Sequence, residues 1–180
     1  EPLTLGAGFR FSTYGIGGNP GPEYWLSVGQ QMSEKFTGSH PEALWIVGNF
    51  MGDGKTYLSF HAETDDPNIT SGYVDMNAQP LDLFDQNGFK VWLQVEPANA
   101  DMKTLVDLVL GRYKSHACVI GFGVDVEWNK EADFPERGEK ISDDTARQWE
   151  AWVKAHDPGY RLFIKHWDPL WMPPNYRGDI

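Results

Sequence analysis

Short apolar runs alternate with longer amphipathic stretches along most of the chain, a pattern typical of strands that alternate with helices. The apolar runs predict strands at residues 9–14, 43–50, 89–96, 119–127 and 161–166, and a short extra strand at 56–60. Apolar positions at helical spacing predict helices at residues 22–36, 81–86, 101–113 and 143–156, and a polar loop is predicted at residues 64–70. Such an order of elements forms βαβ units around a parallel sheet.

Two kinds of parallel sheet fit this order, a doubly wound sheet and a barrel. A nucleotide-binding sheet has no support, because no G-x-G-x-x-G follows a predicted strand and no P-loop is present. Polar and aromatic residues stand at the ends of several predicted strands, and in a barrel these ends meet at one mouth. They are Thr13, Tyr14, Asn49, Gln94, Glu96, Asp125, Glu127, Trp128, His166 and Trp167. We therefore expect an α/β fold of the (β/α)8 TIM-barrel type.

The number of predicted strands is smaller than a complete barrel needs. An eight-stranded barrel usually takes about 250 residues, whereas this chain has 180 residues and five to six predicted strands. We expect residues 1–180 to form a single catalytic-type barrel domain that is truncated at its C-terminus. The alternatives are a trimmed chain, a second chain or segment that completes the barrel, and a smaller open sheet.

The charge of the chain narrows the classes of partner. Fifteen basic and 26 acidic residues give a formal net charge of −11, and such a surface repels phosphate backbones and anionic lipid. We expect no nucleic-acid partner and no membrane partner, and no apolar run reaches the roughly 18 residues of a membrane helix.

The single cysteine, Cys118, excludes an internal disulfide. The first residue is Glu1 rather than methionine, which indicates either a removed signal peptide or a chain shortened for expression, and we expect a secreted protein.

The strongest chemical signal is a pair of carboxylates near the end of the strand predicted at residues 119–127. Asp125 and Glu127 are two positions apart, so on a strand their side chains face the same way, roughly 7 Å apart. The charge of Asp125 and partial burial favour a protonated Glu127, which is the state of a proton donor. Glycoside hydrolysis needs such an acid at the leaving oxygen. A capping or salt-bridging pair at a strand end is the alternative interpretation.

This strand resembles the catalytic strand of family-18 chitinases and of family-25 lysozymes. Of the chitinase motif D-x-x-D-x-D-x-E, the chain matches the final D-x-E, at Asp125 and Glu127, while the two earlier aspartates fall on Ile120 and Gly123. The resemblance implies that Glu127 is the acid and that Asp125 orients the substrate N-acetyl group as an internal nucleophile. It covers about ten residues and the order of the elements, and the departure leaves substrate and mechanism open.

Other strand-end residues supply a second acid and substrate contacts. Glu96 closes the strand before and is a candidate second carboxylate for a two-acid mechanism, or alternatively a loop cap before proline. His166 is a candidate to bind a sugar hydroxyl or to tune Glu127, or alternatively a strand-end histidine with a purely structural role. The further substrate-binding candidates are Tyr14, Gln94, Trp128, Trp167 and Trp171, since flat aromatic rings stack on the faces of pyranose rings.

The leading hypothesis is a glycosidase that cleaves a chitin-like polysaccharide, peptidoglycan or a β-glucan, without a cofactor or a metal. One alternative is a non-catalytic carbohydrate-binding barrel. Another is a metal-dependent hydrolase built on His61 and Glu63, which alternate with Asp65 along the chain. Because no second ligand cluster completes that group in the sequence, a solvated strand edge is the favoured interpretation of it.

Overall fold

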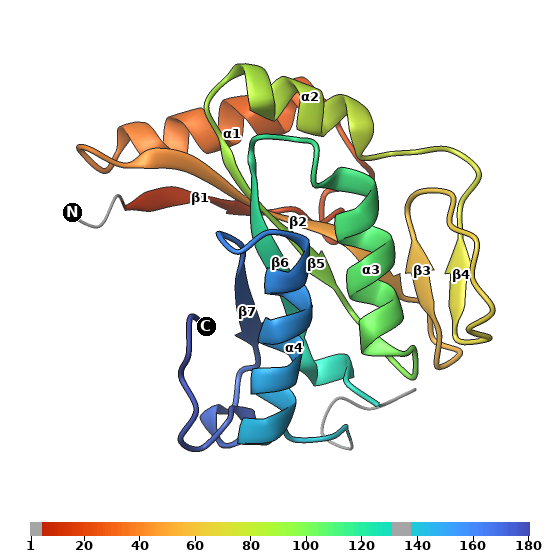
Figure 1. Cartoon of the computed structure of the whole chain (residues 1–180). Helices are drawn as coiled ribbons and strands as arrows, with labels where there is room; N and C mark the ends of the chain where they lie inside the picture. Colours follow the sequence, from red (N-terminus) through yellow and green to blue (C-terminus); the bar gives the residue numbers. More distant parts are fainter. Residues whose placement is uncertain (1–4, 131–137) are drawn as a thin grey trace.

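Seven strands form one mostly parallel sheet, and four α-helices pack on it (Figure 1). The computed structural model describes residues 5–130 and 138–180, and these counts refer to them. The strands are β1 (Gly6–Arg10), β2 (His40–Phe50), β3 (Thr56–Leu58), β4 (Ile69–Ser71), β5 (Lys90–Val95), β6 (Val119–Asp125) and β7 (Arg161–Lys165). The helices are α1 (Pro22–Glu34), α2 (Ala78–Gln86), α3 (Met102–Tyr113) and α4 (Asp143–His156), with single 3₁₀ turns at Val126–Trp128 and Pro169–Trp171.

Five parallel strands follow each other across the sheet in chain order, β1-β2-β5-β6-β7. The order never reverses, so the sheet is singly wound, unlike a doubly wound nucleotide-binding sheet. Right-handed crossovers that all advance in one direction place their helices on one face of the sheet, as Figure 1 shows. The α/β class and the parallel sheet are confirmed. Within the described residues the sheet does not close, because β7 pairs only with β6.

The hydrophobic core lies between the sheet and the four helices. Alternate residues of the central strands enter it, for example Val91, Leu93 and Val95 of β5, which share one cluster with Leu105 and Val109 of α3. Burying one such side chain contributes about 1.5–3 kcal/mol. Because side chains alternate between the faces of a strand, the residues in between point to the face that carries no helix.

The first strand was predicted too late in the chain. The structure places β1 at Gly6–Arg10, whereas residues 9–14 were predicted from their aromatic content. The glycines, which disfavour strands by propensity, are required here by packing: a Cβ atom on Gly8 would overlap the backbone of Glu42 in β2. Phe11 still donates a backbone hydrogen bond to Leu44 O (2.8 Å), so the pairing ends just past Arg10.

Two further predictions were wrong in detail. The polar loop predicted at residues 64–70 runs into β4, which pairs with β3 to form a small parallel extension of the sheet. The strand predicted at residues 119–127 ends at Asp125, because the Asp125 side chain accepts a hydrogen bond from the Glu127 amide and starts a 3₁₀ turn. Asp125 and Glu127 therefore do not follow each other along one strand face.

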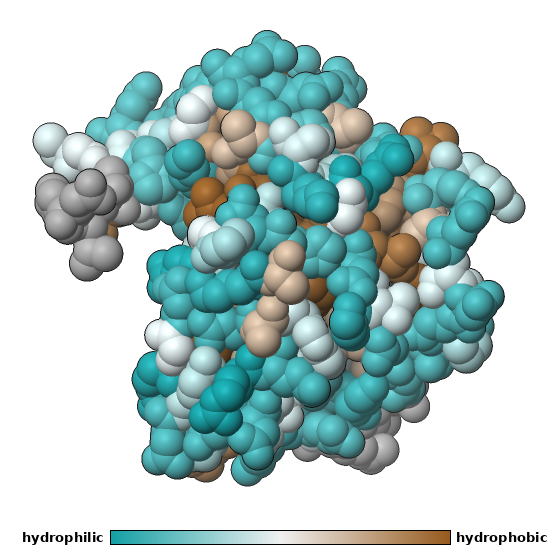
Figure 2. Space-filling model, in the orientation of Figure 1, coloured by the Kyte–Doolittle hydropathy of each residue, from teal (hydrophilic) through white to brown (hydrophobic). Residues whose placement is uncertain are grey.

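The helix-bearing side of the molecule is mostly hydrophilic, and hydrophobic residues show mainly in the seams between elements (Figure 2). This surface agrees with the acidic composition.

Two helices begin with side-chain caps, Asp101 at α3 and Ser142 at α4, each accepting a hydrogen bond from an amide of the first turn. Among the residues described, no helix combines the length and the apolar character needed to cross a membrane.

Candidate active site

Five charged side chains meet at the carboxyl ends of the parallel strands, on the face without helices. Arg10 ends β1, Glu96 follows β5, Asp125 ends β6, Glu127 lies in the turn after it, and Lys165 ends β7. We call these five residues the charged cluster. It unites the three carboxylates predicted from the sequence with two cations that the sequence analysis did not select. In α/β proteins with parallel sheets, ligand sites usually lie at the carboxyl ends of the strands.

Asp125 is the buried centre of the charged cluster. Its side chain is only 3% exposed, and its Oδ2 atom lies 3.1 Å from an Arg10 guanidinium nitrogen and 3.3 Å from Lys165 Nζ. Lys165 also pairs with Glu127, so one ammonium group holds both carboxylates together despite the turn between them. Burial raises the pKa of Asp125; the Lys165 charge opposes this shift, and the Glu127 charge adds to it. A buried, doubly paired carboxylate is suited to orienting its neighbours rather than to contacting a substrate.

Glu96 is the carboxylate of the charged cluster that lines an adjacent pocket. Its Oε2 atom accepts a hydrogen bond from the Phe50 amide (2.8 Å), and Arg10 lies 3.8 Å from Oε1. Its side chain is 16% exposed, and it contributes to the pocket wall. Burial raises the pKa of Glu96 and the nearby Asp125 charge acts in the same direction, although the Phe50 hydrogen bond and Arg10 oppose it. A carboxyl with a raised pKa is suited to the role of a proton donor.

Gln94 supports the charged cluster from below. It is fully buried, and its Oε1 atom accepts a hydrogen bond from Arg10 Nε (3.1 Å). Its Nε2 atom has no hydrogen-bond partner within residues 5–130 and 138–180. Gln94 was expected to bind substrate; its place beneath the cluster instead lets it fix the plane of the Arg10 guanidinium.

The loops that carry Glu96 and Glu127 are strained next to the charged cluster. Ala98 and Lys130 have positive φ angles of 45° and 58°, which residues with a Cβ atom rarely adopt. The two loops form an isolated parallel bridge, in which the Lys130 amide donates to Ala98 O (2.8 Å). Backbone strain of this kind is concentrated at functional sites, and here it lies directly after two of the candidate carboxylates.

A pocket of about 600 Å³ lies beside Glu96, at the carboxyl ends of β1 and β2 and along the antiparallel strand β3. This volume is within the usual range for small-ligand sites. Tyr14, which was expected to bind substrate, lines it with an almost fully exposed side chain. The wall also includes Phe50, whose ring stacks on Trp128 at 4.5 Å between centroids, so this predicted tryptophan lies next to the pocket.

The other predicted aromatic residues lie together after β7. Trp167 is 70% exposed and can offer a face to solvent, whereas Trp171 is buried. His166 stacks on Trp171 with centroids 4.5 Å apart, and its Nδ1 atom accepts a hydrogen bond from the Asp168 amide (2.8 Å). Its buried Nε2 atom has no partner in the described parts of the chain. Of these three, Trp167 is the one placed to stack on a ligand.

The charged composition of residues 129–140 predicts a loop, and most of this segment, residues 131–137, lies outside the described residues. The candidate metal ligands His61 and Glu63 are both exposed and lie 3.9 Å apart, and Asp65 is exposed as well. They do not form a group with metal-site geometry.

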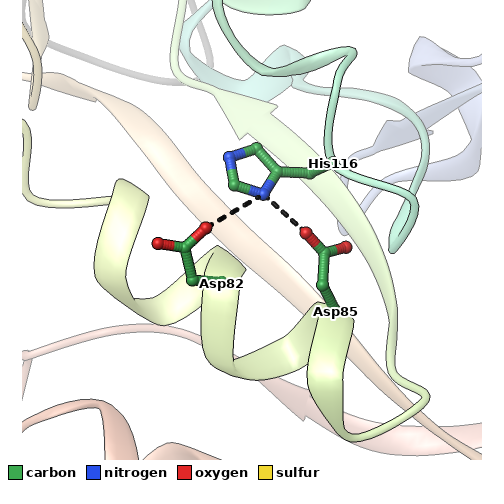
Figure 3. A group of neighbouring side chains, drawn as sticks. All are labelled: Asp82, Asp85 and His116. Carbon is green, nitrogen blue, oxygen red and sulfur yellow. Dashed lines mark hydrogen bonds and ion pairs between the residues drawn. The ribbon is translucent and has the colours of Figure 1, made fainter.

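A different group has that geometry among the described residues: Asp82, Asp85 and His116 (Figure 3). His116 Nδ1 lies 2.7 Å from Asp85 and 3.8 Å from Asp82, and both carboxylates reach it from α2. Asp85 also accepts a hydrogen bond from the Cys118 amide (2.7 Å). The group stands before the amino end of β6, away from the charged cluster, and ties α2 to the loop that enters β6. An ion pair and a hydrogen bond account for its geometry.

Arg10 and Lys165 are the site residues that the sequence reasoning missed. For Lys165 the signal was present in the strand alternation, since Arg161, Phe163 and Lys165 share one face of β7. The register then pairs Lys165 with Asp125 across two neighbouring strands. No family model matches the sequence, and no curated protein does so either, so its function is argued from this geometry.

Proposed function

We propose that the protein is a glycoside hydrolase that acts on a polysaccharide. One observation carries the proposal: three carboxylates meet at the carboxyl ends of β5 and β6, two of them with raised pKa values, beside a pocket with aromatic and amide walls. Glycosidases need one carboxyl that stays protonated and a second that stays ionised. Chitin-like polymers, peptidoglycan and β-glucans are the substrate classes to test.

The geometry favours Glu96 as the proton donor and Glu127 as the second carboxylate. Glu127 was expected to be the acid, but its side chain pairs with Lys165, which leaves Glu96 as the carboxyl that faces the pocket. Burial raises the pKa of Glu96, which favours its neutral form. In this assignment Glu127 acts as base or nucleophile, and Asp125 assists by holding Lys165 and Arg10 in place.

We also propose that the sheet is part of a (β/α)-barrel. The singly wound order, the helices on one face and the charged cluster on the other are the arrangement of a barrel wall. Further strands, from this chain or from a second one, would have to pair with β7 and with β1. Hydrogen exchange can test this: protection of outward-facing β7 amides in solution supports closure, and rapid exchange contradicts it.

The enzymatic proposal is tested by the release of new reducing ends from chitin, chitosan, peptidoglycan, cellulose and mixed-linkage glucan. Glu96→Gln and Glu127→Gln should each abolish the release that the wild type gives. Glu34→Gln is the matched control, since Glu34 is an exposed residue at the end of α1. Activity of the wild type should fall on the alkaline side as Glu96 loses its proton. Release that survives both variants would remove these carboxylates from the chemistry.

A non-catalytic carbohydrate-binding protein is the second candidate. The observation that favours it is the pairing within the charged cluster, where Asp125 and Glu127 already have a cation partner and Glu96 already accepts a backbone hydrogen bond. In that case the wild type releases no reducing ends from any polymer, yet it binds oligosaccharides, and Glu127→Gln binds them equally well.

A further inference from the structure

The pocket beside Glu96 is a separate structural unit from the charged cluster. The residues of the charged cluster lie at the carboxyl ends of β1, β5, β6 and β7. The walls of the pocket come from the segment after β1, the end of β2, and β3. Only Arg10 and Glu96 belong to both. A ligand in this pocket would therefore reach the cluster at one end, through Glu96.

The floor of the pocket is rigid and has its hydrogen bonds satisfied internally. Trp45 donates to Asn77 Oδ1 (3.0 Å), and Asn77 Nδ2 donates to the Tyr113 hydroxyl (2.9 Å) and to Ser59 Oγ (3.0 Å). Phe11 stacks on Trp45 at 4.2 Å. These groups form a fixed, largely aromatic floor, and they have few hydrogen bonds left to offer a ligand.

The wall of the pocket carries the polar groups that remain available. The side-chain amide of Asn49 and the hydroxyl of Tyr57 form no hydrogen bond with any described residue. Asn19 uses its Oδ1 atom for the Gly21 amide and the Trp25 indole, so its amide nitrogen remains as a donor. Neutral donors and acceptors above an aromatic floor are the usual means of binding a sugar ring.

The charge of the pocket is balanced, in contrast to the whole protein. Arg10 and Glu96 are the charged residues among those that line it, and their side chains face each other at 3.8 Å. A neutral ligand leaves this pair intact, whereas an anionic ligand would compete with Glu96 for Arg10 and would meet the field of a chain with a net charge of −11.

We propose that this pocket binds a neutral mono- or disaccharide unit of the substrate, with Asn49 and Tyr57 as its specificity-determining contacts. The inference rests on the proposed function for the role of Glu96, but the binding event does not. The end of β2, which carries Asn49, and β3, which carries Tyr57, then determine which sugar is accepted, while the charged cluster carries the chemistry.

Binding is measured on the intact protein by calorimetry, without any turnover. The probes are cellobiose and N,N′-diacetylchitobiose as neutral disaccharides, and digalacturonic acid as the anionic one. Asn49→Ala and Tyr57→Phe should each weaken binding of the better neutral probe by about 3- to 10-fold, the usual effect of one lost hydrogen bond. Asn87→Ala is the control, because Asn87 is exposed at the end of α2 and should leave the affinity unchanged.

The outcomes separate this inference from the proposed function. Neutral-probe binding that depends on Asn49 and Tyr57 supports the pocket, even if no polymer is cleaved. If the protein cleaves a polymer but both variants bind the neutral probes with wild-type affinity, the proposed sugar binding in this pocket is wrong and the proposed hydrolase function is retained. Tighter binding of digalacturonic acid than of either neutral probe overturns the inference as well.

Discussion

Replacing Lys165 by methionine tests the charged cluster without any assumption about its substrate. Lys165 is the cation that Asp125 and Glu127 share. Methionine keeps most of the apolar stem and removes the ammonium group. The change therefore leaves two carboxylates close together, with Arg10 as the cation that still contacts Asp125.

The expected loss follows from the geometry of this ion pair. At the 3.3 Å between Lys165 Nζ and Asp125 Oδ2, two unit charges attract by about 5 kcal/mol at an effective dielectric constant of about 20. Lys165 is 39% exposed, so solvent screens the attraction, and burial of both ions offsets part of it. With Arg10 still in place, we expect the free energy of unfolding at neutral pH to fall by about 1–3 kcal/mol.

The loss should depend on pH in a defined direction. The folded-state pKa of Asp125 is raised by burial, so its contribution to stability falls as pH rises from the unfolded-state pKa through the folded-state pKa. Removing Lys165 raises the pKa of Asp125 further, because Lys165 is one of the groups that lower it. The destabilisation should therefore be larger at about pH 7.5 than at about pH 4.5, because protonation at lower pH removes the charge that has lost Lys165 as a partner.

The assay is urea unfolding followed by tryptophan fluorescence at both pH values, with Lys35→Met as the matched control. Lys35 is exposed directly after α1 and has no ion-pair partner among the described residues. A Lys165→Met protein as stable as the wild type at neutral pH would refute the reasoning. So would a loss of equal size at both pH values, because it would show that the charge of Asp125 is not the cause.

Three further predictions concern the packing around the site. Gly123→Ala should lower the free energy of unfolding by about 1–3 kcal/mol in urea titrations, since the added Cβ atom would overlap the ring of Phe163; wild-type stability in this variant would contradict the packing. Asn77→Ala should cost about 2–4 kcal/mol in the same titration, because it leaves the buried indole N–H of Trp45 without its acceptor, and a loss below 1 kcal/mol would mean that water replaces the amide. Cys118 is buried, and burial raises the pKa of its thiol, so thiol reagents should label it only at the rate of unfolding; fast labelling of the folded protein would contradict this burial.

The parts of the site that the sequence revealed are those encoded within one strand. Asp125 and Glu127 stand out because they interrupt an apolar run, and Glu96 because it closes another. Lys165 does not stand out, since its role depends on a register that aligns it with Asp125 of the neighbouring strand. A partner 40 residues away in the chain is not visible from local pattern.

The fold shows the same division between local and non-local information. β5 and α3 were predictable because alternation and helical spacing are local properties. β1 was misplaced because its glycines are required by close packing against a neighbouring strand, which local pattern does not show. β4 was missed because its three residues form a strand only through their pairing with β3. The carboxyl end of β6 was mistaken for strand because the Asp125 cap outweighs the apolar pattern there.

The length of β2 has a consequence for how such a protein can diverge. Its first part pairs with β1, its central part pairs with β5, and its last three residues pair with β3. The segment from Met51 to Ser71 is therefore an addition at the end of a strand whose place in the sheet is already set by β1 and β5. That segment supplies one wall of the pocket and no member of the charged cluster. Changes of sequence or length there alter what the pocket accepts while the five parallel strands stay as they are. Under the proposed function, ligand recognition can thus change on one segment while the charged cluster beside it stays the same.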